Sequence, residues 1–140
     1  MRDLKKVLEL NGIQATPQRV AIAEVVLDSD CHPSADQVLE KVFERGTNVS
    51  RATVFNTLNI FVEHGLCRAL VLTEGHVVYD PKMERHHHLV DEDSGRIYDL
   101  PWDAVEVKVN RPVEGFEVEQ LEVVVRGRRH STDLHEQKDF

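Results

Sequence analysis

The stretch Ser50–Gly65, SRATVFNTLNIFVEHG, decides the fold of the N-terminal part of this 140-residue chain. Ser50 is a favourable helix N-cap, and Gly65 is typical of a helix C-terminus. Apolar side chains recur at helical spacing and predict one buried face, made by Val54, Leu58, Phe61 and Val62. The opposite face lacks the Lys and Glu pairs of an ordinary solvated helix and carries Arg51, Ala52, Phe55, Asn56 and Asn59.

This outward face has the chemistry of base recognition. Asparagine can read adenine, arginine can read guanine or contact phosphate, and an apolar side chain can touch a thymine methyl group in the major groove. The face therefore predicts a DNA-recognition helix. The alternative is that Phe55 packs against a neighbouring element.

Three shorter helices are predicted before this one, and a hairpin after it. Asn11-Gly12 ends a first helix, Thr16-Pro17 opens a second that runs to about Leu27, and Ser34–Gln37 has the form of a capping box opening a third. After Gly65, the apolar stretches 66–72 and 76–79 are joined by a turn sequence. Helices followed by a hairpin are the order of a winged helix-turn-helix.

His86-His87-His88 is the second informative motif. On a strand, His86 and His88 point to the same face, so their imidazoles can share one metal ion, whereas His87 points away and is expected to be a surface or second-site histidine. Asp80, Asp99 and the more distant His32 complete a candidate ligand set. This mixture of nitrogen and oxygen donors suits Fe(II), Mn(II) or Zn(II). The alternative for a histidine triplet is a solvated loop.

Composition restricts the partners. The formal charge is −8, with 9 basic against 11 acidic residues in 1–82 and 8 against 14 in 83–140, so DNA binding should be specific rather than a general attraction to phosphate. No apolar run approaches the ~20 residues of a membrane span, and we expect a cytoplasmic protein without a membrane partner. Cys31 and Cys67 form no C-x-x-C pair, and both are expected to be buried or partly buried thiols.

With these motifs in view, the chain resembles the ferric uptake regulator family of metal-dependent bacterial transcription factors. The resemblance covers about Leu4 to Arg129. It rests on the order and spacing of five motifs: Thr16-Pro17-Gln18-Arg19, His32-Pro33-Ser34-Ala35-Asp36, the helix that begins at Ser50, Tyr79-Asp80, and the histidine triplet.

The resemblance implies a regulatory metal, Fe(II) or Mn(II) with Zn(II) possible on purification, that joins two domains through His32, Asp80, His86, His88 and Asp99. With aspartate at position 99, the chain resembles the peroxide-sensing branch of the family. In that branch, Fe(II) and hydrogen peroxide oxidise a ligating histidine, which here would be His32 or His86. The same aspartate also resembles the iron response regulators, which leaves iron or haem sensing as the alternative. No structural zinc is expected, because Asp91 and Ser94 stand where many members carry their first C-x-x-C pair.

The predicted fold class is α+β. A winged-helix DNA-binding domain (residues 1–80) is followed by a hinge (81–82), a small α/β dimerisation and metal-sensing domain (83–130) and a disordered tail (131–140). Strands are expected around Arg96–Tyr98, at Phe116 and Val118, and over Leu121–Val125, with a bulge or break between the last two. We expect a homodimeric repressor, not an enzyme, that contacts double-stranded DNA through Arg19, Ser50, Arg51, Thr53, Phe55 and Asn56. A metal-dependent hydrolase is the competing class, which lacks an evident general base and leaves the recognition helix unexplained.

Overall fold

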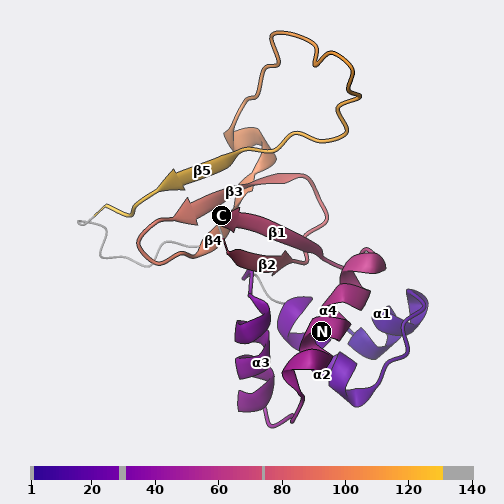
Figure 1. Cartoon of the computed structure of the whole chain (residues 1–140). Helices are drawn as coiled ribbons and strands as arrows, with labels where there is room; N and C mark the ends of the chain where they lie inside the picture. Colours follow the sequence, from indigo (N-terminus) through magenta and orange to yellow (C-terminus); the bar gives the residue numbers. More distant parts are fainter. Residues whose placement is uncertain (1, 29–30, 74, 131–140) are drawn as a thin grey trace. The chain divides into compact units, whose positions relative to one another are not determined.

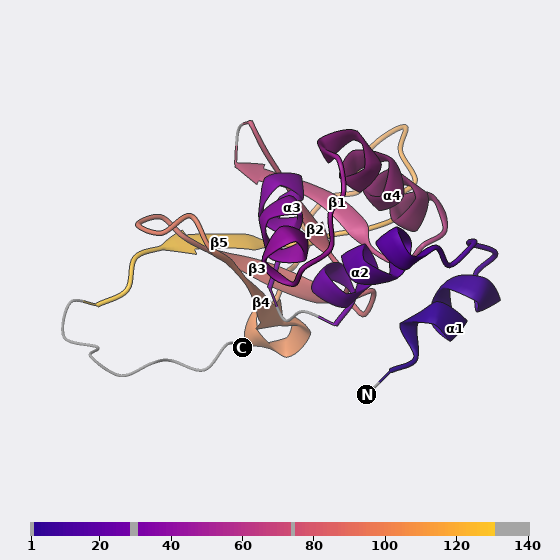
Figure 2. The ribbon, with the colours of Figure 1, turned by 90° about the horizontal axis from the view of Figure 1, so that it is seen from below.

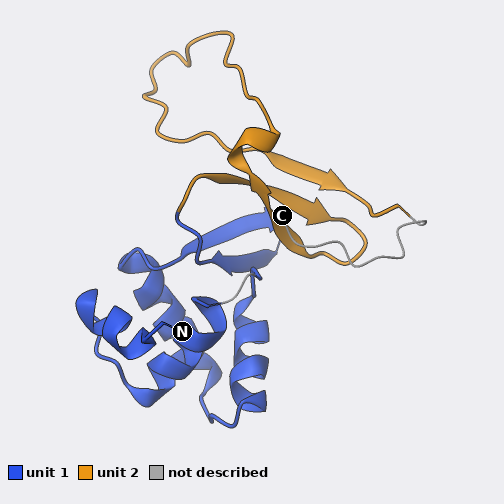
Figure 3. Cartoon of the chain, turned by 180° about the vertical axis from the view of Figure 1, so that it is seen from behind, with its two compact units in different colours: residues 1–83 blue, residues 84–140 orange. Residues whose placement is uncertain are grey.

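The computed structural model describes residues 2–28, 31–73 and 75–130. The chain divides into two compact units, residues 1–83 (unit 1) and 84–140 (unit 2), which Figure 3 colours separately. The predicted tail 131–140 lies outside the described residues.

Unit 1 contains four helices, α1 (Leu4–Leu10), α2 (Pro17–Val26), α3 (Ala35–Glu44) and α4 (Arg51–Glu63) (Figure 1). Their starts follow from the sequence. Thr16 and Ser50 cap α2 and α4 by accepting backbone N–H groups, and Ser34 and Gln37 form the predicted capping box of α3. Gly65, just past α4, has φ +73°, a left-handed conformation that glycine adopts without steric cost.

The helices of unit 1 enclose an apolar core. α2 packs against each of the other three helices, and α3 also packs against α4; Figure 2 shows the same helices from below. Val54, Leu58 and Phe61 of α4 are fully buried, as the helical spacing predicts. The exposed face of α4 is the predicted one, Arg51, Ala52, Phe55, Asn56 and Asn59.

A two-stranded hairpin follows α4 in unit 1. β1 (Arg68–Thr73) pairs antiparallel with β2 (His76–Asp80), which confirms the predicted hairpin and the winged-helix order. The hairpin is attached to the segment before α3, because the Tyr79 amide donates to the Pro33 carbonyl (2.9 Å) and Ser34 forms a bridge with Val78. These contacts bring the start of α3 and the end of β2 together.

Unit 2 contains a three-stranded sheet of order β4-β3-β5. β3 (His86–Asp91) pairs antiparallel with β4 (Ile97–Pro101) and parallel with β5 (Val124–Gly127). A 3-10 turn, η1 (Trp102–Ala104), follows β4 directly. Together the units form an α+β protein, which confirms the predicted fold class.

The strand expected at Phe116 and Val118 is wrong, and the strand expected over Leu121–Val125 is shorter and starts later, at Val124. Residues 105–123 form an irregular connection between η1 and β5 (Figure 1). Within the described residues the sheet of unit 2 ends at β5, and residues 116–118 pair with no strand. Phe116 (78% exposed) and Val118 (51%) accordingly remain at the surface.

Among the described residues, none of the helices is sufficiently long and hydrophobic to span a bilayer.

Candidate metal centre and nucleic-acid interface

The histidine triplet lies on β3, and its neighbours in the sheet place three donor residues on one face. His86 and His88 are two residues apart on the strand, and Asp99 of β4 lies directly opposite His88 in the antiparallel register. Directly opposed residues share a face of the sheet. Each of His86, His88 and Asp99 offers one donor atom, and these atoms lie within 4.8 Å of one another.

The orientation of His86 follows from its backbone contact. Its Nδ1 lies 2.6 Å from the Glu84 carbonyl oxygen. A carbonyl oxygen only accepts, so Nδ1 is the donor of this contact, and Nε2 is the ring nitrogen directed at the other donor residues, as in many metal-binding histidines. This Nε2 lies 3.2 Å from Oδ1 of Asp99, and the ring centroid of His88 lies 4.7 Å from that of His86.

Unit 1 holds the other two predicted ligands as a pair. His32 precedes Pro33, whose carbonyl is fixed to β2, and Asp80 is the last residue of β2. The two side chains are buried, with Nε2 of His32 3.3 Å from Oδ2 of Asp80. The Lys82 amide donates to Oδ1 of Asp80 (2.9 Å), and Arg68 of β1 lies 3.7 Å from Oδ2. Sequence reasoning did not single out Arg68, because its place beside Asp80 depends on the hairpin register.

The five predicted ligands therefore fall into two groups, His32 with Asp80 in unit 1 and His86, His88 and Asp99 in unit 2. Each group combines imidazole with carboxylate, and neither contains a thiolate. This donor chemistry fits Fe(II), Mn(II) or Zn(II). Neither group alone fills an octahedral shell.

The predicted DNA-contacting residues all lie in unit 1, at α2 and α4. Arg51, at the first position of α4, pairs with Asp36 of α3 (2.7 Å), and its guanidinium carbon lies 5.5 Å from the centre of the Phe55 ring. Phe55 is 38% exposed, so it is not packed into the core. Asn56 is exposed beside it. Asp36 was not identified from the sequence, since its contact with Arg51 is between helices.

The remaining predicted DNA contacts also have structural partners. Ser50 Oγ accepts from the Thr53 amide (3.1 Å) and lies 2.9 Å from the Thr53 hydroxyl, so both side chains serve the helix cap. Arg19 of α2 donates to the Gln14 carbonyl (3.0 Å). The start of α4 is nonetheless exposed, and a helix N-terminus attracts phosphate through its partial positive charge.

The prediction that His87 lies at the surface is wrong. Its side chain is 1% exposed and stacks on Trp102, with ring centroids 4.6 Å apart and planes inclined by 16°. Alternation along the strand predicts only that His87 faces away from His86 and His88. The cover comes from η1, which follows β4 and brings Trp102 over the ring.

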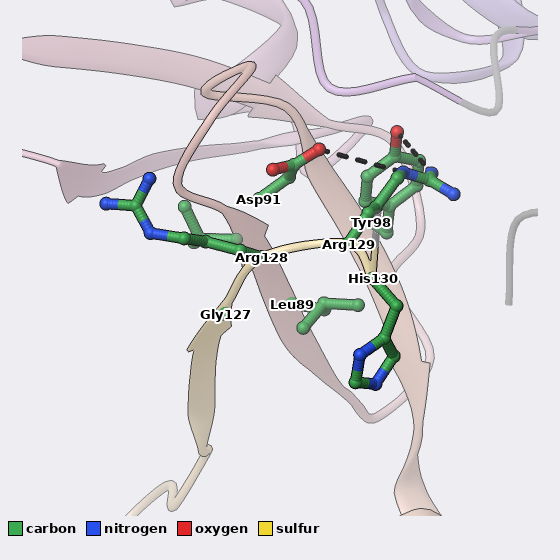
Figure 4. Close-up of a pocket in the computed structure, with 8 residues that line it drawn as sticks. Leu89, Asp91, Tyr98, Gly127, Arg128, Arg129 and His130 are labelled. Carbon is green, nitrogen blue, oxygen red and sulfur yellow. Dashed lines mark hydrogen bonds and ion pairs between the residues drawn. The ribbon is translucent and has the colours of Figure 1, made fainter. Parts of the chain in front are cut away.

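Ion pairs connect the C-terminal ends of β3 and β5 in unit 2. The acidic partners are Asp91, the last residue of β3, with Glu92 and Asp93 of the following turn. The basic partners are Arg126 of β5 with Arg128 and Arg129 after it, and we call these six residues the arginine clasp. Arg129 Nε lies 3.7 Å from Asp91, its Nη2 donates to the Tyr98 hydroxyl (3.0 Å), Arg126 pairs with Glu92 (3.4 Å), and Arg128 pairs with Asp93. Figure 4 shows Arg129 between Asp91 and Tyr98, beside a small pocket.

The positions that carry cysteine in many family members take part in this clasp. Asp91 accepts from the Asp93 amide (3.0 Å) and from the Ser94 hydroxyl (2.9 Å). The Asp93 amide, the Ser94 hydroxyl and, more weakly, the charge of Arg129 lower the pKa of the Asp91 carboxyl below its ordinary value of 3.8.

The two cysteines differ. Burial, with a smaller effect of the Asp80 charge, raises the pKa of the Cys67 thiol to about 12. Cys67 is thus a buried apolar side chain, as predicted, whereas Cys31 is exposed, contrary to the prediction.

A winged-helix unit with an exposed face on α4, joined in one chain to a sheet that gathers imidazoles and a carboxylate, is the arrangement expected of DNA-binding regulators that respond to a metal ion. The model of the ferric uptake regulator family matches residues 10–126. The chain belongs to the ferric uptake regulator family.

Individual relatives agree with this membership. The peroxide operon regulator of Bacillus subtilis is 34% identical over 128 residues, which cover 89% of this chain and 81% of that protein. The peroxide-responsive repressor PerR of Staphylococcus saprophyticus is 30% identical over 128 residues, covering 91% and 76%. The ferric uptake regulator from Pseudomonas aeruginosa, solved with manganese, shares the fold with a TM-score of 0.69, 24% identity and coverage of 91% of this chain and 98% of that one.

Proposed function

We propose that this protein is a metal-dependent, homodimeric DNA-binding repressor that responds to hydrogen peroxide. The observation that carries the proposal is the grouping of His86, His88 and Asp99 on one face of the β3–β4 pair. The similarity to relatives named as peroxide regulators supports the peroxide response. Unit 1 is proposed as the DNA-binding domain and unit 2 as the dimerisation and sensing domain.

The regulatory ion is proposed to be shared between the two donor groups. His32 and Asp80 would supply two ligands, and His86, His88 and Asp99 would supply three. Three neutral imidazoles and two carboxylates carry a charge of −2, which a divalent cation cancels. An ion held by donors from both units favours the form of the protein in which the donors meet, and it thereby selects one DNA-binding conformation.

The peroxide response is proposed to occur on the ligands themselves. Bound Fe(II) would supply the one-electron chemistry by which peroxide oxidises a nearby imidazole. The net change adds one peroxide oxygen to a ring carbon of His32 or His86 and releases the other oxygen as water. His32 then loses its fit to the ion, or His86 loses the orientation fixed by Glu84, and the metal-dependent conformation is lost.

DNA recognition is proposed to use α4 from two copies of the chain. Asn56 and Arg51 provide the base-reading groups, and the exposed start of α4 provides phosphate contact. Two recognition helices in a dimer must match half-sites about 34 Å, or a multiple of this, apart. The exposed apolar side chains of residues 105–123 in unit 2 favour burial against a second copy.

Two variants separate the DNA and metal roles. Mn(II)-loaded protein is used to select duplexes from a random library, and affinity for a selected duplex is measured by fluorescence anisotropy. Asn56→Ala should weaken DNA binding by roughly 1–3 kcal/mol and leave Mn(II) binding intact. Asp99→Ala should lower Mn(II) affinity by at least about tenfold and make the remaining DNA affinity insensitive to Mn(II).

The control variant is Asn110→Ala, an exposed asparagine in unit 2, which should change neither affinity. Unchanged DNA binding in Asn56→Ala would exclude α4 as the recognition helix. Release of DNA by peroxide should require Fe(II) and should not occur with Mn(II). Protein that binds Fe(II) and DNA and keeps both in peroxide would instead be an iron response regulator.

A further inference from the structure

His87 has a place that the proposed function does not use. It lies between the two ligand histidines on β3, and its buried side chain stacks on Trp102. Arg85 adds to the same cluster, with its guanidinium carbon 5.6 Å from the centre of the Trp102 ring. The first residue of η1 is therefore held against the strand that carries the proposed ligands.

The ring of His87 also holds Val123. The Val123 amide donates to Nδ1 of His87 (2.9 Å), and the His88 amide donates to the Val123 carbonyl (3.1 Å). Because Nδ1 accepts, the ring is in the tautomer with its proton on Nε2. The residue that leads into β5 is thus fixed at both its N–H and its carbonyl to two consecutive residues of the ligand strand.

These contacts share a topological consequence. Trp102 lies just before the connection of residues 105–123, and Val123 is its last residue. The connection leaves η1 and returns to β5 (Figure 1). The residues that flank its start and form its end, Trp102 and Val123, therefore both contact the His87 side chain. The segment carries exposed apolar side chains, including Val109 (52% exposed), Val113 (50%) and Phe116 (78%), and within the described residues it has no strand or helix of its own.

We propose that His87 is a positioning residue that couples the ligand strand to the connection of residues 105–123. The inference rests on the proposed function only in taking His86 and His88 as metal ligands. An ion bound by His86 and His88 restrains the β3 backbone on both sides of His87. With His87 already held in place, the contacts of Trp102 and Val123 with its ring form at a smaller cost in conformational entropy. Metal binding then orders the connection, and loosening the contacts of His87 weakens metal binding by the same factor.

Three variants separate the two contacts of His87. His87→Asn keeps an acceptor near the position of Nδ1 but removes the stack. His87→Phe keeps an aromatic ring against Trp102 but removes the acceptor. Trp102→Leu removes the stack by changing a side chain that is 42% exposed. It does not alter the buried strand, so it still tests the stack if the His87 variants fold poorly. Glu117→Gln is the control, because it alters the same connection at an exposed polar position.

The test is hydrogen exchange of the peptide containing Val123, followed by mass spectrometry, in the metal-free and Mn(II)-loaded full chain. In the wild type, Mn(II) should slow exchange at Val123, and both His87→Phe and Trp102→Leu should reduce this effect. The same two variants should lower Mn(II) affinity by about fivefold or more, a typical coupling between sites. His87→Asn should restore part of the Val123 protection lost in His87→Phe, and Glu117→Gln should behave like the wild type.

The failures are distinguishable. If Mn(II) binds and slows exchange in the peptide containing His86 and His88 but leaves Val123 unaffected, or if Trp102→Leu keeps full Mn(II) affinity and the full response, the coupling is contradicted and the proposed function stands. If Mn(II) does not bind, or does not protect the β3 peptide, the metal site itself is wrong and the coupling is overturned with it.

Discussion

The two units of this chain are stabilised by different interactions. Unit 1 buries a continuous apolar core contributed by all four helices. In unit 2, over the described residues 84–130, the buried side chains are Val90 and four polar ones, His86, His87, His88 and Asp91. Apolar burial is insensitive to ligands, whereas buried imidazoles and carboxylates depend on protons, ions and partners. Unit 1 also buries His32 and Asp80, but in unit 2, the proposed sensing unit, such groups make up most of the buried side chains, so its stability should depend more on its surroundings.

The largest effect should come from the core of unit 1. Phe61→Ala removes a fully buried ring and should cost about 3–5 kcal/mol of unfolding free energy. Urea unfolding followed by far-UV circular dichroism measures it, because the described α-helices all lie in unit 1. Phe55→Ala, on the exposed face of the same helix, is the control and should cost far less. Equal losses would contradict the assignment of the buried face.

Metal should have the next largest effect, on unit 2. Trp102, the one tryptophan in the sequence, lies in this unit and reports its unfolding by fluorescence. Free Mn(II) at 100 times its dissociation constant should stabilise the folded state by about 2.7 kcal/mol. His88→Ala should abolish the shift, and His130→Ala, at an exposed histidine outside the site, should retain it. A shift that survives His88→Ala would remove His88 from the metal centre.

The Asp91 carboxylate should make unit 2 sensitive to acid. Its pKa is lowered in the folded state, chiefly by the Asp93 amide and the Ser94 hydroxyl, so its contribution to stability is complete above its ordinary value of 3.8 and is lost as the pH falls through the lower, folded value. Asp91→Asn should lower the Trp102 unfolding midpoint at neutral pH and flatten its decline in acid. Asp103→Asn, on the exposed η1 turn, should do neither. An unaltered acid profile in Asp91→Asn would show that the hydrogen bonds accepted by Asp91 do not stabilise unit 2.

The smallest effect should come from the exposed pair of Arg126 and Glu92. Both side chains are more than a third exposed, at 45% and 39%, and such a pair contributes at most about 1 kcal/mol. Glu92→Gln should therefore shift the Trp102 midpoint slightly at low salt and not at all at high salt. A large loss that persists in high salt would mean that Glu92 has a structural role beyond its charge.

The same contrast explains what the sequence could predict. In unit 1, helical spacing, caps and turn residues act locally, and the four helices, the hairpin and the buried face of α4 were all predicted correctly. In unit 2, alternation predicted that His86 and His88 share a face. It could not predict that Trp102 would cover His87, or that Arg129 would reach Asp91, because these contacts join residues distant in sequence.

The strand expected at Phe116 and Val118 failed for a related reason. Apolar alternation shows that a segment can form a strand, but a strand also requires a neighbour to accept its hydrogen bonds. Within the described chain this segment pairs with no strand, not even at the outer edge of β5. Apolar alternation alone does not indicate whether such pairing forms.

His32 or His86 is proposed to be oxidised by hydrogen peroxide when the protein holds Fe(II). The most direct measurement is peptide mass spectrometry of purified protein loaded with Fe(II) or with Mn(II) and then treated with stoichiometric hydrogen peroxide. We predict one added oxygen atom on the peptide of His32 or His86 with Fe(II), and none with Mn(II). An unmodified chain that demonstrably holds Fe(II) would contradict the peroxide-sensing account.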